Sequence, residues 1–236
     1  MDDTARDAER TLAIDIGGTG LKAAILDARG GMLSERVRVL TPRPATPEAV
    51  IGALSPLVEP LRPFDRASVG FPGVVVEDTV RDAPNLDGDW SGVPLGAELS
   101  RLFGVAVHVA NDADIQGYGV VEGRGVELVI TLGTGVGSAL FLDGRLVPNL
   151  ELGHHRFRKG QAYEGQLGEP ARRRVGNRKW NRRLAKAIRH LRGCFNFRAL
   201  YLGGGNSKHV CLELPDDVQL VRNVRGITGG IALWEH

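Results

Sequence analysis

The chain has 236 residues, 42% of them hydrophobic and 25% charged, which fits one large or two small folded domains. Residues 1–10 are polar and charged, so we expect no signal peptide, and no apolar run is long enough to span a membrane. The two cysteines, Cys194 and Cys211, form no metal-type cluster, which favours a reduced, cytoplasmic protein.

The net charge of +2 is unevenly distributed along the chain. Residues 1–113 contain 11 Lys and Arg against 17 Asp and Glu, a net charge of −6, whereas residues 114–236 contain 19 against 11, a net charge of +8. This asymmetry indicates two lobes, of which the basic one suits a polyanion. A solvated basic face without any ligand is the alternative, and charge alone does not decide between them.

The first predicted element is a β-hairpin over Leu12–Leu26. One apolar run ends at Asp15, a glycine-rich turn follows at residues 17–20, and a second apolar run comes directly after it. Glycine lets backbone N–H groups approach a phosphate, Thr19 adds a hydroxyl, and Asp15 suits a hydrated Mg²⁺. An ordinary turn is the alternative, and the direction of the Lys22 side chain along the second strand stays open.

Strands and helices alternate up to residue 110. We expect strands over residues 32–40, 67–71 and 105–110, a hairpin over residues 74–81, and helices over residues 48–54 and 94–103. Thr46 and Pro47 are typical of a helix start, and Gly104 of a helix end. The first helix extends to Val58 only if Pro56 does not end it.

The stretch Asn111-Asp112-Ala113-Asp114 begins a helix directly after a strand. Because N–H groups at a helix N-terminus stabilise an anionic side chain, Asp112 is the candidate catalytic residue. Capping of the helix by Asn111 or Asp112 is the alternative interpretation.

The second half repeats the order of the first. Strands are expected over residues 127–132, 139–142 and 145–147, joined by the glycine-rich turn Gly133–Ser138 and by Asp143-Gly144. We therefore predict two related α/β lobes. An amphipathic helix over residues 177–192 follows, with Trp180, Leu184, Ile188 and Leu191 on its apolar face. A strand over residues 199–202 then enters Gly203–Ser207, and a closing helix is expected over residues 225–234.

Three glycine-rich turns thus each follow a strand, and none has the Walker or dinucleotide spacing. Such turns from two lobes suit a phosphate chain held in a cleft by backbone N–H groups. Glu151 and His154 are spaced to bind vicinal hydroxyls of one sugar ring. His154 as a metal ligand is the alternative, although zinc needs further ligands.

Seven motifs in this order resemble those of the ROK family of sugar kinases and repressors. They are Asp15-Ile-Gly-Gly-Thr, Phe71-Pro-Gly, Ala83-Pro-Asn-Leu, Asn111-Asp-Ala-Asp, Leu132-Gly-Thr-Gly-Val-Gly-Ser, Glu151-Leu-Gly-His and Gly203-Gly-Gly. Residues 18–22, 35–42 and 44–47 resemble the polyphosphate glucokinase branch of that family. The resemblance implies an α/β, two-lobed, actin-like and hexokinase-like (ribonuclease H-like) ATPase fold with a central cleft. Its lobes would be residues 1–112 and 113–225, with a helix near residues 226–236 packing back on the first.

The resemblance also implies a glucokinase that makes glucose 6-phosphate with Mg²⁺ and with polyphosphate, ATP or both as donor. Asp112 would be the general base. The residues implied in sugar binding are Asn85, Asn111, Asp112, Glu151, His154 and Glu164, with Glu169 as the alternative to Glu164. Those implied in phosphate or nucleotide binding are Asp15, Gly17, Gly18, Thr19, Lys22, Gly133, Thr134, Gly135, Gly203, Gly204 and Gly205. Asp15 would hold Mg²⁺ through water.

Further expectations concern partners. Many family members carry a cysteine-rich zinc motif after the Glu-x-Gly-His element, but residues 156–164 contain no cysteine, so no zinc is expected. A homodimer is what the family implies. About ten residues precede the first strand, which leaves no room for the helix-turn-helix of ROK repressors, so we expect no nucleic-acid binding. A sugar-binding regulator or an inactive sugar-binding protein is the alternative function, and glucose and mannose are not distinguished.

The donor is also left open. Ten Lys and Arg residues lie within residues 172–192, and Arg156, Arg158 and Lys159 precede them. We expect part of this basic face to follow a polyphosphate chain, because arginine suits phosphate oxygens. A solvated helix face is the alternative.

Overall fold

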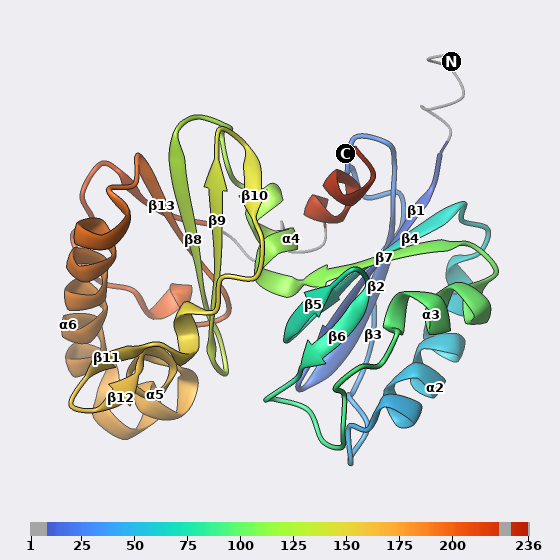
Figure 1. Cartoon of the computed structure of the whole chain (residues 1–236), viewed down its shortest axis with the longest axis horizontal. Coiled ribbons are helices and arrows are strands. Elements are labelled where there is room, and N and C mark those ends of the chain that lie inside the picture. The colour runs from blue at the N-terminus through green and yellow to red at the C-terminus, as the bar shows by residue number, and fades with distance from the viewer. Residues whose placement is uncertain (1–8, 222–227, 236) are drawn as a thin grey trace. The chain divides into compact units, whose positions relative to one another are not determined.

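The computed structural model describes residues 9–221 and 228–235 of the chain. They form two compact units, one of residues 9–119 with 228–235 and the other of residues 120–221. Each unit contains one five-stranded sheet, and the two sheets share one topology: three strands joined as antiparallel neighbours, then two parallel strands (Figure 1). The predicted repeat of strand, glycine-rich turn and strand is therefore confirmed.

The first unit's sheet has the order β3-β2-β1-β4-β7. Its strands are β1 (Thr11–Gly17), β2 (Gly20–Leu26), β3 (Val37–Val39), β4 (Arg66–Phe71) and β7 (Ala106–Asn111). The predicted first hairpin is confirmed, with Gly17 opposite Gly20. The strand expected over residues 32–40 is shorter, because the Ser34 hydroxyl accepts the Ile25 N–H that a longer third strand would bond.

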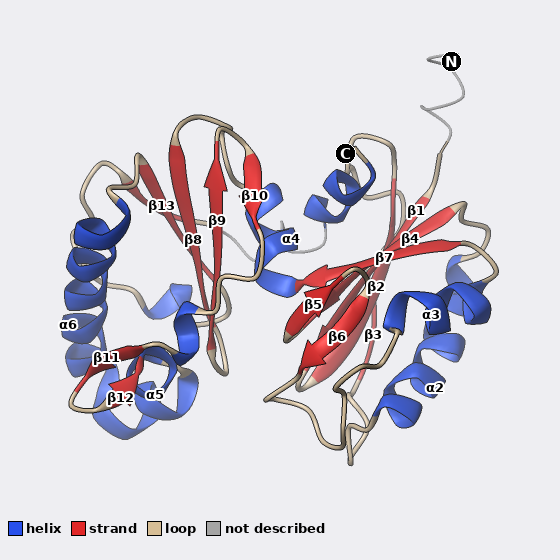
Figure 2. Ribbon diagram, viewed as in Figure 1, coloured by secondary structure: helices blue, strands red, loops and turns tan. Residues whose placement is uncertain are grey.

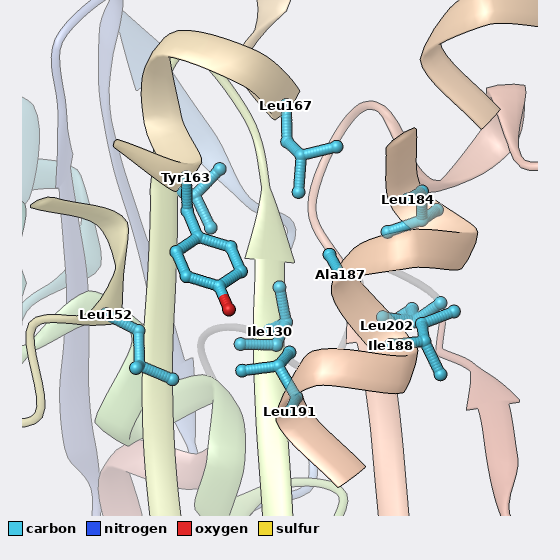
Figure 3. A pocket seen from close by; sticks show the side chains of 10 residues that line it. Ile130, Leu152, Tyr163, Leu167, Leu184, Ala187, Ile188, Leu191 and Leu202 are labelled. Atoms are coloured by element: carbon cyan, nitrogen blue, oxygen red, sulfur yellow. The ribbon is translucent and has the colours of Figure 1, made fainter. Parts of the chain in front are cut away.

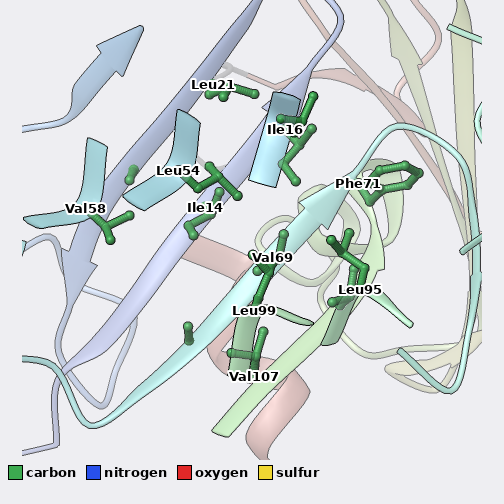
Figure 4. Packing of buried hydrophobic residues seen from close by; sticks show 14 of the residues in the cluster. Ile14, Ile16, Leu21, Leu54, Val58, Val69, Phe71, Leu95, Leu99 and Val107 are labelled. Atoms are coloured by element: carbon green, nitrogen blue, oxygen red, sulfur yellow. The ribbon is translucent and has the colours of Figure 1, made fainter. Parts of the chain in front are cut away.

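Helices cover both faces of this sheet. On one face α2 (Pro47–Val58) and α3 (Leu95–Phe103) bury apolar side chains against Ile14 and Val69 (Figure 4). The other face, with Ala13 and Ser68, contacts α4 (Asp112–Tyr118) and the 3-10 helix η4 (Gly229–Trp234). Because both faces are covered, β1 is buried along most of its length. The remaining elements are η1 (Glu59–Leu61), β5 (Val74–Val76) and β6 (Thr79–Asp82).

The predicted helix limits in this unit are confirmed in most respects. Thr46 caps α2, its hydroxyl accepting the Ala49 N–H at 3.4 Å. The helix continues past Pro56 to Val58, because burial of its last turn against the sheet outweighs one missing hydrogen bond. Gly104 ends α3 in the left-handed conformation, with φ of 76°.

The second unit's sheet has the order β10-β9-β8-β13-β14. Its strands are β8 (Val126–Leu132), β9 (Val136–Leu142), β10 (Arg145–Val147), β13 (Ala199–Gly203) and β14 (Val218–Leu220). Smaller elements follow β10 and β13: η2 (Leu152–His154), β11 (Arg156–Arg158), β12 (Gln161–Ala162), α5 (Tyr163–Leu167) and η3 (Ser207–His209). The edge strand β14 is only three residues long, and the sequence did not predict it.

The long helix α6 (Glu169–Phe195) consists of two parts. Gly176 has φ of 77° and ψ of 157°, which is not helical, so the second part begins where the sequence predicts a helix. Its predicted apolar face is confirmed, since Trp180, Leu184, Ile188 and Leu191 are all buried. Leu184, Ile188 and Leu191 line a small apolar cavity together with Ile130 of β8 and Tyr163 of α5 (Figure 3).

The predicted closing helix covers residues 225–234, of which 225–227 lie outside the described residues. The rest forms η4 in the first unit (Figure 2). A Cβ on Gly229 would lie 1.8 Å from the Ile115 carbonyl oxygen, so only glycine permits this approach to α4. In the described ranges no helix combines the length and the apolar character needed to cross a bilayer.

Candidate active site

The first glycine-rich turn places Asp15 and Lys22 together. The two residues are directly opposite in the β1–β2 register, so their side chains point to the same face. Lys22 Nζ donates to Asp15 Oδ2 at 2.7 Å, and both side chains are partly exposed. The direction of Lys22, which the sequence left open, is therefore towards Asp15.

The turn between these strands is held by side chains from residues 40–46, the connector between β3 and α2. The sequence did not assign this connector to the site. The Thr41 hydroxyl donates to the Gly17 carbonyl, and Arg43 Nη2 donates to the Gly18 carbonyl at 2.9 Å. Arg38 of β3 is also close, since a Cβ on Gly20 would lie 2.7 Å from its Nε. Arg43 lies between Pro42 and Pro44 in the sequence, and no predicted motif assigned it to the site.

Asp112 is the first residue of α4, and Asn111 is its N-cap. Asn111 Oδ1 accepts the Ala113 N–H at 2.8 Å, and its Nδ2 donates to the Gly73 carbonyl at 3.0 Å. The capping function therefore belongs to Asn111, which positions the start of the helix. Asp112 is half-buried at this N-terminus, where the helix dipole favours the ionised carboxylate.

The strand register brings the two aspartates to the same edge of the sheet. Asp15 on β1 pairs with Gly70 on β4, and the next residue, Phe71, pairs with Asn111 on β7. These strands are parallel, so their carboxyl ends lie at the same edge of the sheet. The ends of β1 and β7 are separated there by two strand spacings, about 10 Å. Asn85 is exposed, and its backbone carbonyl oxygen would lie 3.5 Å from a Cβ added to Gly18. The first unit thus collects the first glycine-rich turn, Asp15, Asn85 and Asp112.

In the second unit the other two glycine-rich turns contact each other. Gly204 has φ of 83°, and a Cβ there would lie 2.4 Å from the Leu132 carbonyl oxygen. The buried side chain of Asn206 donates to the Gly133 carbonyl at 2.9 Å, and its backbone N–H donates to Leu132 at 2.8 Å. The sequence did not single out Asn206, although it follows the Gly203–Gly205 run directly.

The predicted sugar-binding residues of this unit lie beside the second glycine-rich turn. His154 Nε2 is 3.9 Å from Glu164 Oε2, and a Cβ on Gly135 would be 2.3 Å from the same oxygen. Glu151 is half-buried and precedes η2, the short helix that carries His154. The structure therefore gathers His154 and Glu164 at Gly135, and Glu151 directly precedes the short helix that carries His154.

Glu169, the alternative to Glu164, has different partners. Its two carboxylate oxygens accept hydrogen bonds from Arg172 at 2.8 Å each, and Arg173 donates a third at 2.7 Å. The hydrogen bonds from Arg172, helped by those from Arg173, lower the pKa of Glu169 to about 2. Glu169 is thus part of an ion-pair cluster at the start of α6, whereas Glu164 faces His154.

Among the residues that the structure describes, no three His, Cys, Asp or Glu side chains come together in a way that could hold a metal ion. A Mg²⁺ ion needs less, because it is commonly held by one or two carboxylates, water and substrate phosphates. The partly exposed carboxylate of Asp15 at a glycine-rich turn fits that requirement.

Known proteins resemble this chain in sequence. A model of the ROK family matches residues 11–170. Polyphosphate glucokinase of Mycobacterium tuberculosis is 40% identical over 152 residues, which are 60% of this chain and 56% of that protein. Glucokinase of Streptomyces coelicolor is 35% identical over 146 residues, 58% of this chain and 44% of that protein. The chain spans about half the length of these curated relatives.

Solved structures resemble it over nearly its whole length. The inorganic polyphosphate/ATP-glucomannokinase of Arthrobacter sp. strain KM is 36% identical with a TM-score of 0.87, covering 97% of this chain and 100% of that one. A ROK family glucokinase of Streptomyces griseus, solved with glucose and AMPPNP, is 22% identical with a TM-score of 0.80, covering 95% and 98%. The second likeness concerns the fold alone. Together they confirm the predicted actin-like, hexokinase-like α/β fold class.

Proposed function

The chain belongs to the ROK family, and we propose that it is a hexose kinase that makes glucose 6-phosphate from glucose. The proposed donor is inorganic polyphosphate, ATP or both. The observation that carries the proposal is the likeness to the Arthrobacter glucomannokinase, with 36% identity across nearly the full length of both chains. The polyphosphate glucokinase of M. tuberculosis, 40% identical over part of its length, supports the same donor and sugar.

Asp112 is the proposed general base. Its carboxylate takes the proton of the sugar 6-hydroxyl while that oxygen bonds to the terminal phosphorus, and the bond from phosphorus to the rest of the donor breaks. Its place at the N-terminus of α4 supports this role, because N–H groups at a helix N-terminus stabilise an anionic side chain. Asn111 and its bond to Gly73 fix the position of Asp112.

The remaining residues bind and orient the reactants in this proposal. Glu151, His154 and Glu164 would bind sugar hydroxyls, and the glycine-rich turns would bind phosphate oxygens through backbone N–H groups. Asp15 would hold Mg²⁺ through water, and the bound ion would neutralise charge on the donor phosphates. Lys22, paired with Asp15, keeps a cation beside the first turn.

The test is a matrix of sugars and donors assayed with Mg²⁺, followed by Asp112→Asn. We expect this variant to lose about 10²- to 10⁴-fold in kcat, the usual contribution of a general base, with glucose affinity by calorimetry nearly unchanged. Asp216→Asn, which removes an exposed carboxylate of the second unit, is the charge-matched control. Turnover of Asp112→Asn close to that of the native chain would remove Asp112 from this role. Glucose binding without turnover by the native chain would leave only a sugar-binding protein.

A further inference from the structure

Three arginines of the second unit converge on the end of α5. Arg158 comes from β11, Arg174 from the first part of α6 and Arg183 from its second part. Arg174 Nη2 donates to the Gly165 carbonyl at 3.3 Å and Arg183 Nη1 to the Gln166 carbonyl at 3.2 Å. Arg158 Nη1 lies 3.5 Å from the side-chain oxygen of the buried Gln166. We call these three residues the arginine cluster.

The arginine cluster has no acidic partner among the residues that the structure describes. The acidic residues near it in the chain are engaged elsewhere, Glu164 facing His154 and Glu169 bonded to Arg172 and Arg173. Burial, followed by the charges of Arg158 and Arg174, lowers the pKa of the Arg183 guanidinium. Three cations therefore remain close together without compensation inside this unit.

Capping of α5 is the simplest structural role for these side chains, since cations favour the carbonyl end of a helix. One cation is enough for a helix of five residues, and repulsion disfavours three. Each guanidinium has five N–H donors, and each uses one in the contacts described above. The remaining donors suit an anion with many oxygen atoms, and bidentate phosphate binding is typical of arginine.

The arginine cluster also adjoins the second glycine-rich turn. The backbone N–H of Glu169 donates to the Gly133 and Thr134 carbonyls at 2.9 and 3.2 Å. A Cβ on Gly168 would lie 2.6 Å from the Thr134 carbonyl oxygen. The short segment from residue 165 to 169 therefore contacts the turn at one end and the arginine cluster at the other.

We propose that Arg158, Arg174 and Arg183 form an anion site that binds the distal phosphates of an inorganic polyphosphate donor, beyond those held at the glycine-rich turn. This inference rests on the proposed kinase function. It adds that the second unit binds inorganic polyphosphate in preference to ATP. In this proposal a long polyphosphate contacts the turn and the arginine cluster together, whereas the three phosphates of ATP bind at the turn. The site therefore favours long polyphosphate over ATP and over tripolyphosphate.

The test compares KM for long-chain polyphosphate with KM for ATP and for tripolyphosphate in Arg174→Ala and Arg183→Ala. Arg189→Ala, an exposed arginine on the same helix, is the control for charge. Loss of one charge-assisted hydrogen-bonding group should raise the ratio of the long-chain KM to the ATP KM about tenfold in either cluster variant. Arg189→Ala should leave the ratio unchanged. Thermal unfolding shows whether each variant folds. If Arg183→Ala does not fold, Arg174→Ala, at an exposed residue, provides the test.

The outcomes separate this inference from the proposed function. Equal ratios in the cluster variants and in Arg189→Ala overturn the anion site and leave the kinase intact. If the native chain phosphorylates no sugar with any donor, the kinase proposal fails, and titration with long-chain polyphosphate alone decides the site. Weaker binding by the Arg174→Ala, Arg183→Ala double variant than by Arg189→Ala then supports it, and equal binding overturns it. Equally strong competition by inorganic phosphate would indicate a single-phosphate site and overturn the chain-binding inference.

Discussion

Glu164 and Glu169 lie five residues apart, and only their partners distinguish them. If Glu164 binds a sugar hydroxyl, Glu164→Gln removes a charged acceptor and should raise KM for the hexose about tenfold. Steady-state kinetics at saturating donor measure this effect. Glu169→Gln is the matched control, because its carboxylate is bonded to Arg172 and Arg173. If only Glu169→Gln raises the KM for the hexose, Glu169 and not Glu164 is the sugar-binding residue.

Glu169 should instead affect stability in acid. Its pKa falls from an ordinary 4.5 to about 2 in the folded chain, so its contribution is complete above pH 4.5 and is lost as the pH falls towards 2. Thermal unfolding of Glu169→Gln should therefore differ most from that of the native chain near neutral pH and converge with it in acid. An unchanged difference across this range would contradict the assigned ion pairs.

The sequence predicts those candidate site residues that belong to local motifs. Asp15, the glycine-rich turns and the start of α4 are each decided by neighbours in the chain, so pattern reasoning locates them. Arg43 and Asn206 were missed because their bonds to Gly18 and Gly133 join residues 25 and 73 positions apart. Contacts at such separation depend on how sheets and connectors pack, which a single sequence does not display.

At the scale of elements, Gly176 separates the two parts of α6. Its φ of 77° and ψ of 157° belong to a region that only glycine occupies without strain, while nothing lies within 4 Å of a Cβ built there. We expect Gly176→Ala to destabilise the chain by about 1–3 kcal/mol through the backbone alone. Urea unfolding followed by circular dichroism measures this.

Gly193 provides the control in the same helix. It is exposed, helical and also without neighbours within 4 Å of an added Cβ. Gly193→Ala should therefore stabilise the chain by roughly 0.5–1 kcal/mol. If both substitutions act in the same direction, the break at Gly176 does not depend on glycine. The sequence located the second part of α6 by its apolar face but not the first, where the pattern Glu-Pro-Ala-Arg-Arg-Arg has no such face.

At the scale of the whole molecule, the repeated strand order and the repeated glycine-rich turns are one observation. Each unit folds around a hairpin whose turn ends at the carboxyl edge of its sheet. The sequence shows this because each hairpin consists of two apolar runs joined by a turn that is rich in glycine. The sequence does not show where η4 packs. This helix bonds to Ser68 of the first sheet, more than 150 positions earlier in the chain.

Ser68 connects this returning segment to β4. Its buried hydroxyl donates to the Gly230 carbonyl at 2.7 Å and accepts from Trp234 Nε1 at 2.8 Å. The Trp234 ring also lies 4.4 Å from the His108 ring and 4.9 Å from the Arg66 guanidinium carbon. We therefore expect Ser68→Ala to cost about 1–3 kcal/mol, because it leaves two polar groups without their partner.

A double-mutant cycle tests whether η4 is held through this hydroxyl. Trp234→Phe keeps an aromatic ring and removes the N–H, so its effect should overlap with that of Ser68→Ala. The double variant should then be less destabilised than the sum of the two by about 0.5 kcal/mol or more. Ser91→Ala, at an exposed serine, should combine additively with Trp234→Phe and serves as the control. Additive effects in both pairs would mean that the ring contacts, and not the hydrogen bond to Ser68, hold η4 on the first sheet.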